Sequence, residues 1–187
     1  YIPGLHEWEL DFPRLMLRAD ATRQANDQVP LRKRMTTTVL GHTDALGKVA
    51  TTFSPIANAV IGAEPGSLVR KVVEKTSGVS SQRLLPPFAK SRFSTWFKKH
   101  VSPMMTKKQG KVALFPTCLV EYQEPGIGKD LINVYEKNNI ECSLAEGASC
   151  CGAPYLHSGD VDQFKKVGAK NVEALAAAVR AGNDIVV

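Results

Sequence analysis

The sequence predicts an α/β fold in its C-terminal part, preceded by a mainly helical, basic segment. From residue 111 onward, apolar runs and amphipathic stretches alternate in the order β-α-β-α-β, which is typical of a parallel sheet with right-handed crossovers. The four cysteines all lie in this part, at or after position 118. Residues 1–110 carry 17 Lys and Arg against 8 Asp and Glu, whereas residues 111–187 carry 7 against 10.

We therefore divide the chain into a lead-in segment, residues 1–109, and an α/β segment, residues 110–187. The lead-in segment has a net charge of +9, which suits an acidic partner, an anionic membrane surface or a plain solvated linker. It also suits nucleic acid electrostatically, but no nucleic acid partner is expected. The chain begins with Tyr1 and ends on an apolar run, so we expect it to be a piece of a longer protein.

Short helices are expected along the lead-in segment. Mixed apolar and charged residues predict one over Phe12–Ala25, and apolar residues at helical spacing predict another over 43–62, with a break at Pro55 and a cap from Thr43 or Asp44. A compact helix over 67–78 follows and ends at Gly78. These helices do not form a core of their own, so another surface has to cover them.

An aromatic and basic stretch ends the lead-in segment. Phe93, Trp96 and Phe97 stand beside Lys98 and Lys99. Such side chains either contact a membrane or partner, or pack against the α/β segment. The sequence leaves both alternatives open.

The α/β segment has clearer elements. In chain order we expect a strand over 111–117, a helix over 128–139, a strand over 140–146, a helix over 158–182 and a strand over 183–187. Ser158 or Asp160 is predicted to cap the long helix, and Gly182 to end it. The run "EPGIGK" lacks the full spacing of a phosphate-binding loop and is predicted to be a Gly-rich turn.

The cysteines follow the strands. Cys118 comes directly after the first strand, and the adjacent pair Cys150 and Cys151 comes after the second, with 31 residues between. The loops that follow parallel strands leave from the same carboxyl edge, where α/β proteins place their sites. We therefore expect the three sulfurs to gather at one rim of the sheet.

The chemistry of these cysteines is metal binding or redox. Four cysteines without a secretory signal or an apolar run of membrane-spanning length argue against a disulfide framework. Thiolates select iron–sulfur clusters or zinc, and thiol–disulfide redox and plain buried thiols remain alternatives. Cys142, inside a strand, is expected to be a core thiol, and His157 a surface histidine rather than a ligand.

Together, "PTC", the spacing of 31 residues, "CCGAP" and "SGD" resemble the cysteine-rich CCG domain. That domain occurs in the B subunit of heterodisulfide reductase, the C subunit of anaerobic glycerol-3-phosphate dehydrogenase and the iron–sulfur subunits of glycolate oxidase. "NNIEC" and Gly159-Asp160 add to the resemblance, and the lead-in segment is similar to the segment that joins a ferredoxin-type domain to a CCG domain. The resemblance implies a Rossmann-like sheet, of which this chain holds the first part.

The resemblance also implies a site. Cys118, Cys150 and Cys151 become thiolate ligands of a 4Fe-4S-type cluster, and Gly152 relieves crowding after the pair because glycine takes positive φ freely. The family's later C-x-x-C is not in this chain, so the site is expected to be incomplete here. No catalytic residue is assigned.

The function implied is that of an electron-transfer subunit of a multi-component oxidoreductase, in contact with flavin- or quinone-linked partners. We expect it in the cytoplasm, with the basic segment able to hold it at the inner face of the cell membrane. Two alternatives stay open: a docking module for a partner or membrane, with structural cysteines, and a thiol–disulfide redox protein.

Overall fold

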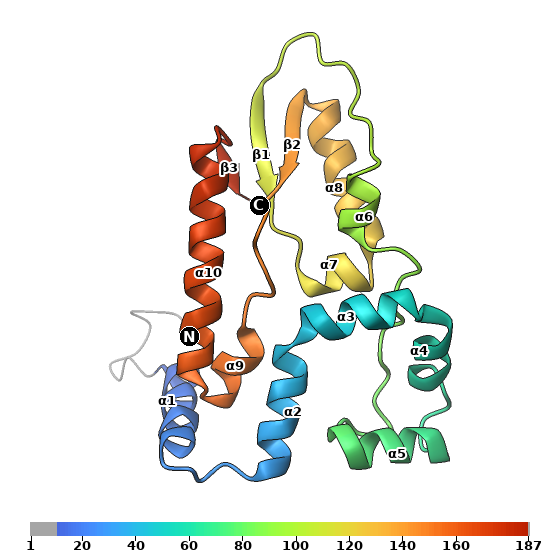
Figure 1. The fold of residues 1–187 in the computed structure, drawn as a ribbon, viewed down its shortest axis with the longest axis vertical. Coiled ribbons are helices and arrows are strands. Elements are labelled where there is room, and N and C mark those ends of the chain that lie inside the picture. The colour runs from blue at the N-terminus through green and yellow to red at the C-terminus, as the bar shows by residue number, and fades with distance from the viewer. Residues whose placement is uncertain (1–10, 187) are drawn as a thin grey trace.

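The computed structural model describes residues 11–186, in which a small parallel sheet stands beside a long array of helices (Figure 1). The elements in chain order are α1 (Phe12–Ala25), α2 (Leu31–Gly41), α3 (Thr43–Thr52), α4 (Ser54–Ile61), α5 (Leu68–Ser77), α6 (Phe93–Phe97), β1 (Gly110–Leu114), α7 (Cys118–Tyr122), α8 (Pro125–Lys137), β2 (Ile140–Leu144), α9 (Ala153–Ser158), α10 (Val161–Arg180) and β3 (Ile185–Val186).

The sheet has the strand order β2-β1-β3, and both pairings are parallel. Val112 of β1 stands opposite Cys142 of β2 on one side and Ile185 of β3 on the other. The prediction of a parallel α/β arrangement is therefore confirmed at this level. The third strand has only two residues, so the described residues do not form a full Rossmann-like sheet.

The two long helices flank the strands. The chain runs from β1 outward to β2 and then back past β1 to β3, and right-handed crossovers place the connecting helices on opposite faces when the direction reverses. Figure 1 shows α8 and α10 on either side of the strands. The side chain of Asp160 caps α10 by accepting a hydrogen bond from the Gln163 backbone N–H at 3.2 Å, as predicted.

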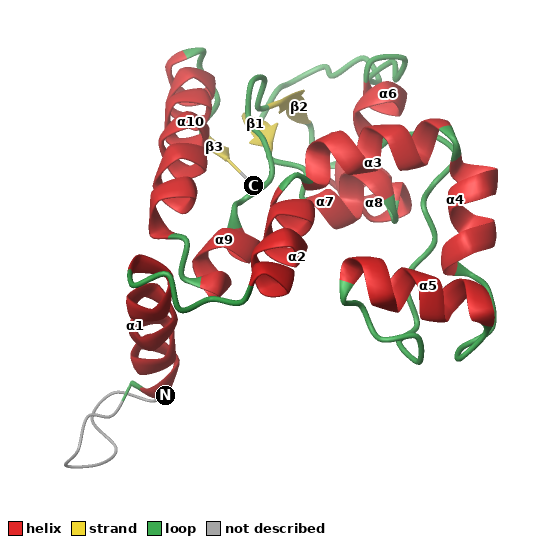
Figure 2. Ribbon diagram, turned by 60° about the horizontal axis from the view of Figure 1, so that its bottom comes forward, coloured by secondary structure: helices red, strands yellow, loops and turns green. Residues whose placement is uncertain are grey.

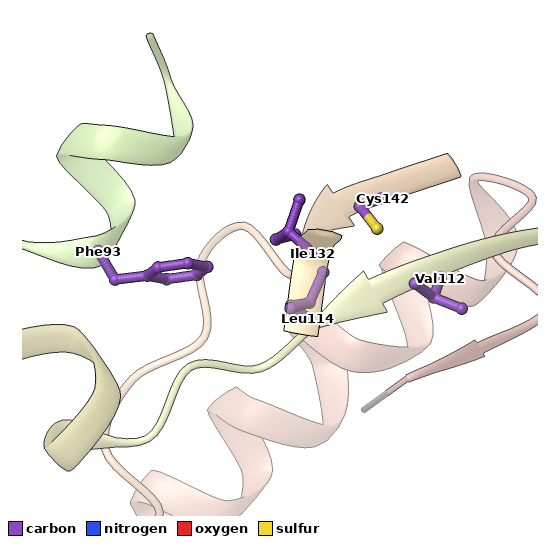
Figure 3. Packing of buried hydrophobic residues seen from close by; sticks show 5 residues of the cluster. All are labelled: Phe93, Val112, Leu114, Ile132 and Cys142. Carbon is purple, nitrogen blue, oxygen red and sulfur yellow. The ribbon is translucent and has the colours of Figure 1, made fainter. Parts of the chain in front are cut away.

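The core joins the lead-in segment to the sheet. Phe93 of α6 is fully buried and packs with Val112, Leu114, Ile132 and Cys142 (Figure 3). Trp96 and Phe97 lie partly buried against the same cluster. Of the two alternatives for this aromatic stretch, packing against the α/β segment is the one observed. Full burial of a phenylalanine side chain contributes about 1.5–3 kcal/mol to the free energy of unfolding.

Most of the expected lead-in helices form. The bounds of α1 match the prediction, α3 and α4 are separate helices with Pro55 in the first turn of α4, and Gly78 ends α5 with a φ of +79°. Helix α2 was not predicted, because its run of three threonines is β-branched and has a low helix propensity. Its threonine hydroxyls donate back to carbonyls one turn earlier, and the helix packs against α9.

Glycines let the lead-in helices approach the α/β segment closely. A Cβ atom on Gly41 would lie 2.2 Å from the Tyr155 ring, and one on Gly47 would lie 2.5 Å from the Tyr122 ring. On the other side of the contact, a Cβ atom on Gly159 would lie 2.3 Å from the Asp20 backbone. Figure 2 shows α9 between α2 and α10. The lead-in helices are thus docked on α7 and α9.

The outer faces of these helices carry apolar side chains. Large exposed ones include Phe12, Leu31, Val49, Phe53, Ile56 and Leu68. The expectation that these short helices need a further covering surface fits this exposure. Among residues 11–186, no helix combines the length and the apolar character that crossing a bilayer requires.

The close approach of α3 to Tyr122 can be tested with Gly47→Ala. The added methyl group would overlap the buried ring, so we expect a loss of about 1–3 kcal/mol in the free energy of unfolding, measured by urea denaturation. Gly168→Ala is the matched control, because it also lies inside a helix but its Cβ would meet nothing within 4 Å. It should gain about 0.5–1 kcal/mol. Equal effects of the two substitutions would contradict the docking described here.

Candidate functional site

The cysteine loops lie at the carboxyl edge of the sheet. The chain leaves β1 at Leu114 and reaches Cys118, the first residue of α7, after a three-residue link that ends in the N-cap residue Thr117. It leaves β2 at Leu144 and reaches Cys150 and Cys151 just before α9. Neither α7 nor α9 was predicted, since each is only one or two turns long.

The thiols of Cys118 and Cys150 lie side by side. Hydrogen bonding from the Cys150 thiol lowers the pKa of Cys118 to about 6, and the backbone N–H groups of Leu119 and Cys118 assist. The pKa of Cys150 is raised, because its thiol proton is shared with Cys118 and because burial disfavours its thiolate. The pair therefore holds one proton and one negative charge at neutral pH.

Cys151 completes the set expected from the sequence. It is exposed, and it lies near enough for its charge to raise the pKa of Cys118. Within the described range 11–186, no three His, Cys, Asp or Glu side chains are arranged to hold a single metal ion. The structure thus places the thiols of Cys118 and Cys150 near enough to shift each other's pKa, and it leaves Cys151 at the surface nearby.

The bend after the pair depends on Gly152. This residue has a φ of +80°, a conformation that L side chains rarely adopt. An added Cβ would also lie 3.3 Å from Phe164 and Val167 of α10. The bend turns the chain into α9. Pro154 lies in the first turn of this helix, where a backbone N–H has no partner within the helix and its absence in proline costs no hydrogen bond.

The main chain of Cys150 is held by Asp44 of the lead-in segment. Its backbone N–H donates to Asp44 Oδ2 at 2.9 Å, and the Tyr122 hydroxyl donates to Asp44 Oδ1 at 3.1 Å. The prediction that Thr43 or Asp44 caps the helix was wrong: the N-cap position is His42, and Asp44 lies in the first turn. Its carboxylate serves the cysteine loop instead.

A second side chain holds the other end of the same residue. Asn171 of α10 donates from Nδ2 to the Cys150 carbonyl at 3.1 Å, and its Oδ1 accepts from the Ser149 backbone N–H at 2.8 Å. Asn171 is buried. The sequence analysis missed both Asp44 and Asn171, because each lies more than 20 residues from Cys150 along the chain. An asparagine within the apolar stripe of a long helix was the one local signal.

Three other sequence predictions concern residues near the site. Cys142 is buried in β2, as expected for a core thiol, and burial raises its pKa to about 11. His157 is exposed in the last turn of α9. The run "EPGIGK" is neither a turn nor a phosphate loop, since Pro125 starts α8 and Gly128 packs under Phe93.

The shared proton makes a prediction for the metal-free protein. Alkylation of Cys118 by iodoacetamide, followed by peptide mass spectrometry, should reach half its maximal rate near pH 6, because the thiolate forms above the lowered pKa. Cys150→Ala removes the donor and should move the midpoint upward toward the ordinary thiol value of about 8.5. Cys142→Ala should leave it unchanged. A profile that Cys150→Ala does not alter would show that the two thiols are not coupled.

Comparison with known proteins relates the C-terminal part of the chain to a family. Residues 112–187 match the family model "CCG: Cysteine-rich domain". The chain is 33% identical over 141 residues to the C subunit of anaerobic glycerol-3-phosphate dehydrogenase from Escherichia coli (strain K12), a match that covers 75% of this chain and 35% of that protein. No solved structure shows a significant match.

Two other relatives match this chain over shorter stretches. The chain is 37% identical over 67 residues to lactate utilization protein A of Shouchella clausii (36% of this chain, 28% of that protein). It is 31% identical over 65 residues to the B subunit of the fumarate reductase (CoM/CoB) of Methanothermobacter marburgensis (35% and 13%). The chain thus spans about a third or less of these relatives. By the cysteine spacing and the matched family model, residues 112–187 are similar to the cysteine-rich domain of the CCG family.

Proposed function

We propose that this chain is part of an electron-transfer subunit of a multi-component oxidoreductase, with Cys118, Cys150 and Cys151 as ligands of a 4Fe-4S-type cluster. The observation that carries the proposal is that the thiols of Cys118 and Cys150 come from two different loops and lie near enough to shift each other's pKa. Relatives named as subunits of a dehydrogenase and of a reductase support the oxidoreductase role.

The donor set fits a cluster better than a single metal ion. Thiolates are the ligands of iron–sulfur clusters. Adjacent cysteines diverge in direction, so they reach two irons of one cluster more readily than one ion. A bound cluster would supply one-electron transfer. The chain's own contribution is to fix the two cysteine loops, to keep one thiolate available at neutral pH and to control hydrogen bonding around the sulfurs.

We further propose that the lead-in segment, residues 1–109, docks partner subunits, and that residues 110–187 begin a larger, Rossmann-like sheet. The exposed apolar side chains of α1 to α5 and the charge of +9 over residues 1–110 support contact with a partner whose own surface is acidic. Flavin- or quinone-linked subunits are the partners we favour. An anionic membrane surface is the alternative occupant.

A second function, thiol–disulfide redox, is favoured by one observation. A thiolate with a pKa of about 6 beside a protonated thiol is the arrangement from which a disulfide forms. Oxidation would join Cys118 Sγ to Cys150 Sγ, with two electrons and the one proton of the pair passing to an oxidant such as a small-molecule disulfide, which leaves as one thiol and one thiolate. This function requires no metal and predicts a reversible Cys118–Cys150 disulfide.

Anaerobic reconstitution of the full-length protein with iron and sulfide decides between them. We expect visible absorption near 400 nm, bound iron and sulfide, and an electron paramagnetic resonance signal after reduction. Cys118→Ser, Cys150→Ser and Cys151→Ser should each lower the bound iron severalfold. Cys142→Ala, a buried thiol outside the site, is the matched control and should retain it.

A colourless wild-type protein without iron would overturn the cluster proposal. If that protein also formed a Cys118–Cys150 disulfide on mild oxidation, the redox alternative would stand. Retention of all iron in the Cys151→Ser variant would remove Cys151 alone from the ligand set.

A further inference from the structure

The lead-in segment supplies a charged side chain to the cysteine site. We infer that Asp44 is a positioning residue for Cys150 that also holds the reduction potential of the cluster low, an inference that rests on the proposed function. The observation behind it is a carboxylate with one oxygen on the Cys150 backbone N–H, at 2.9 Å, and the other on the Tyr122 hydroxyl, at 3.1 Å. The family model begins at residue 112, so Asp44 lies outside the matched domain.

The close approach of helix α3 to Tyr122 of α7 fixes the position of this carboxylate. Gly47, one turn after Asp44, lies directly against the Tyr122 ring, with only 2.5 Å between the ring and an added Cβ. The same tyrosine is buried and also donates to the Asp44 backbone carbonyl, at 3.2 Å. Burial raises the pKa of Tyr122, and the neighbouring Asp44 raises it further. The phenol therefore stays protonated and keeps donating to Asp44.

Cys150 is consequently held from two sides. Asp44 of α3 accepts its N–H, and Asn171 of α10 donates to its carbonyl at 3.1 Å. Asp44 and Asn171 lie on different helices and are 127 positions apart in the sequence. Fixing both peptide groups of one residue fixes the direction of its Cβ–Sγ bond. This orientation matters at Cys150 and Cys151, because the proposed cluster requires both adjacent side chains to point toward one centre.

Two electrostatic effects follow from the choice of a carboxylate. A negative charge beside an iron–sulfur cluster disfavours the reduced, more negative state. The Cys150 N–H is also taken by Asp44 and so is not available to a cluster sulfur, whereas such N–H···S bonds favour reduction. Lys48 and Arg92 line the same cavity as Asp44, of about 490 Å³.

A merely structural role needs only a hydrogen-bond acceptor, and this separates the two explanations. Asp44→Asn keeps the size and one acceptor oxygen but removes the charge. The matched control is Glu64→Gln, which removes the same charge from an exposed side chain between α4 and α5. Tyr122→Phe is a third variant, because it removes one partner of Asp44 and leaves the Cys150 contact in place.

The first measurement is the midpoint potential of the reconstituted full-length protein, titrated anaerobically and followed by electron paramagnetic resonance. Asp44→Asn should favour the reduced state by about tenfold in the equilibrium constant, which corresponds to about 59 mV for one electron. Tyr122→Phe should shift the potential less, and Glu64→Gln should leave it at the wild-type value. An unchanged potential in Asp44→Asn overturns the inference.

The second measurement needs no cluster. In the metal-free protein, hydrogen–deuterium exchange of the Cys150 amide should accelerate at least tenfold in Asp44→Ala, because the amide loses its acceptor, and should stay unchanged in Glu64→Gln. Equal exchange in both variants overturns the positioning role. A wild-type protein that binds no iron contradicts the proposed function, yet this second measurement still reports whether Asp44 holds Cys150. The two failures are therefore distinguishable.

Discussion

The parallel pairing of β1 with β2 is the constraint on which the rest of the arrangement depends. Since Val112 stands opposite Cys142 and both strands run in the same direction, each strand ends at the same edge. The loop that starts α7 and the loop that precedes α9 therefore leave the sheet side by side. Cys118 and Cys150 meet there although 31 residues separate them. An antiparallel pairing would send the two loops to opposite ends.

The lead-in segment is part of the cysteine site in a physical sense. Its helices approach α7 and α9 closely because glycine replaces a side chain at the contacts, at Gly41 and Gly47. This approach brings Asp44 within hydrogen-bond distance of Cys150. A second attachment comes from Phe93, which fills the core between the sheet and α8 (Figure 3). The lead-in segment and the α/β segment therefore share one core, and Asp44 of the lead-in segment holds the loop that carries Cys150. A change in the docking of α3 would alter the position of that loop.

The sulfur pair explains why two chemistries compete at this site. A thiolate stabilised by a neighbouring thiol is ready to bind a soft metal centre, and it is equally ready to form a disulfide when no metal is bound. The arrangement of the other side chains favours the first use. Asp44 and Asn171 restrain the main chain of Cys150, whereas a cysteine pair that cycles between thiol and disulfide has to change its separation.

Local signals in the sequence determined the elements that have their own start and stop residues. The Phe12–Ala25 helix, the break at Pro55, the Gly78 end of α5 and the Asp160 cap of α10 follow from side chains and backbone within a few positions, and so they were predictable. The order of strands and helices likewise predicted that the cysteine loops share one edge.

Only the tertiary structure decided the features that depend on partners far along the chain. Helix α2 forms from a threonine-rich run because α9 covers it, and Phe93 is buried because the sheet receives it. Asp44 looks like a helix cap in the sequence, yet its carboxylate binds Cys150, 106 positions away. A residue's local pattern carries no information on which distant donor will face it. The ligand set proposed here could therefore be drawn from the spacing of the cysteines in the sequence. The side chains that orient Cys150 became visible only in the folded chain.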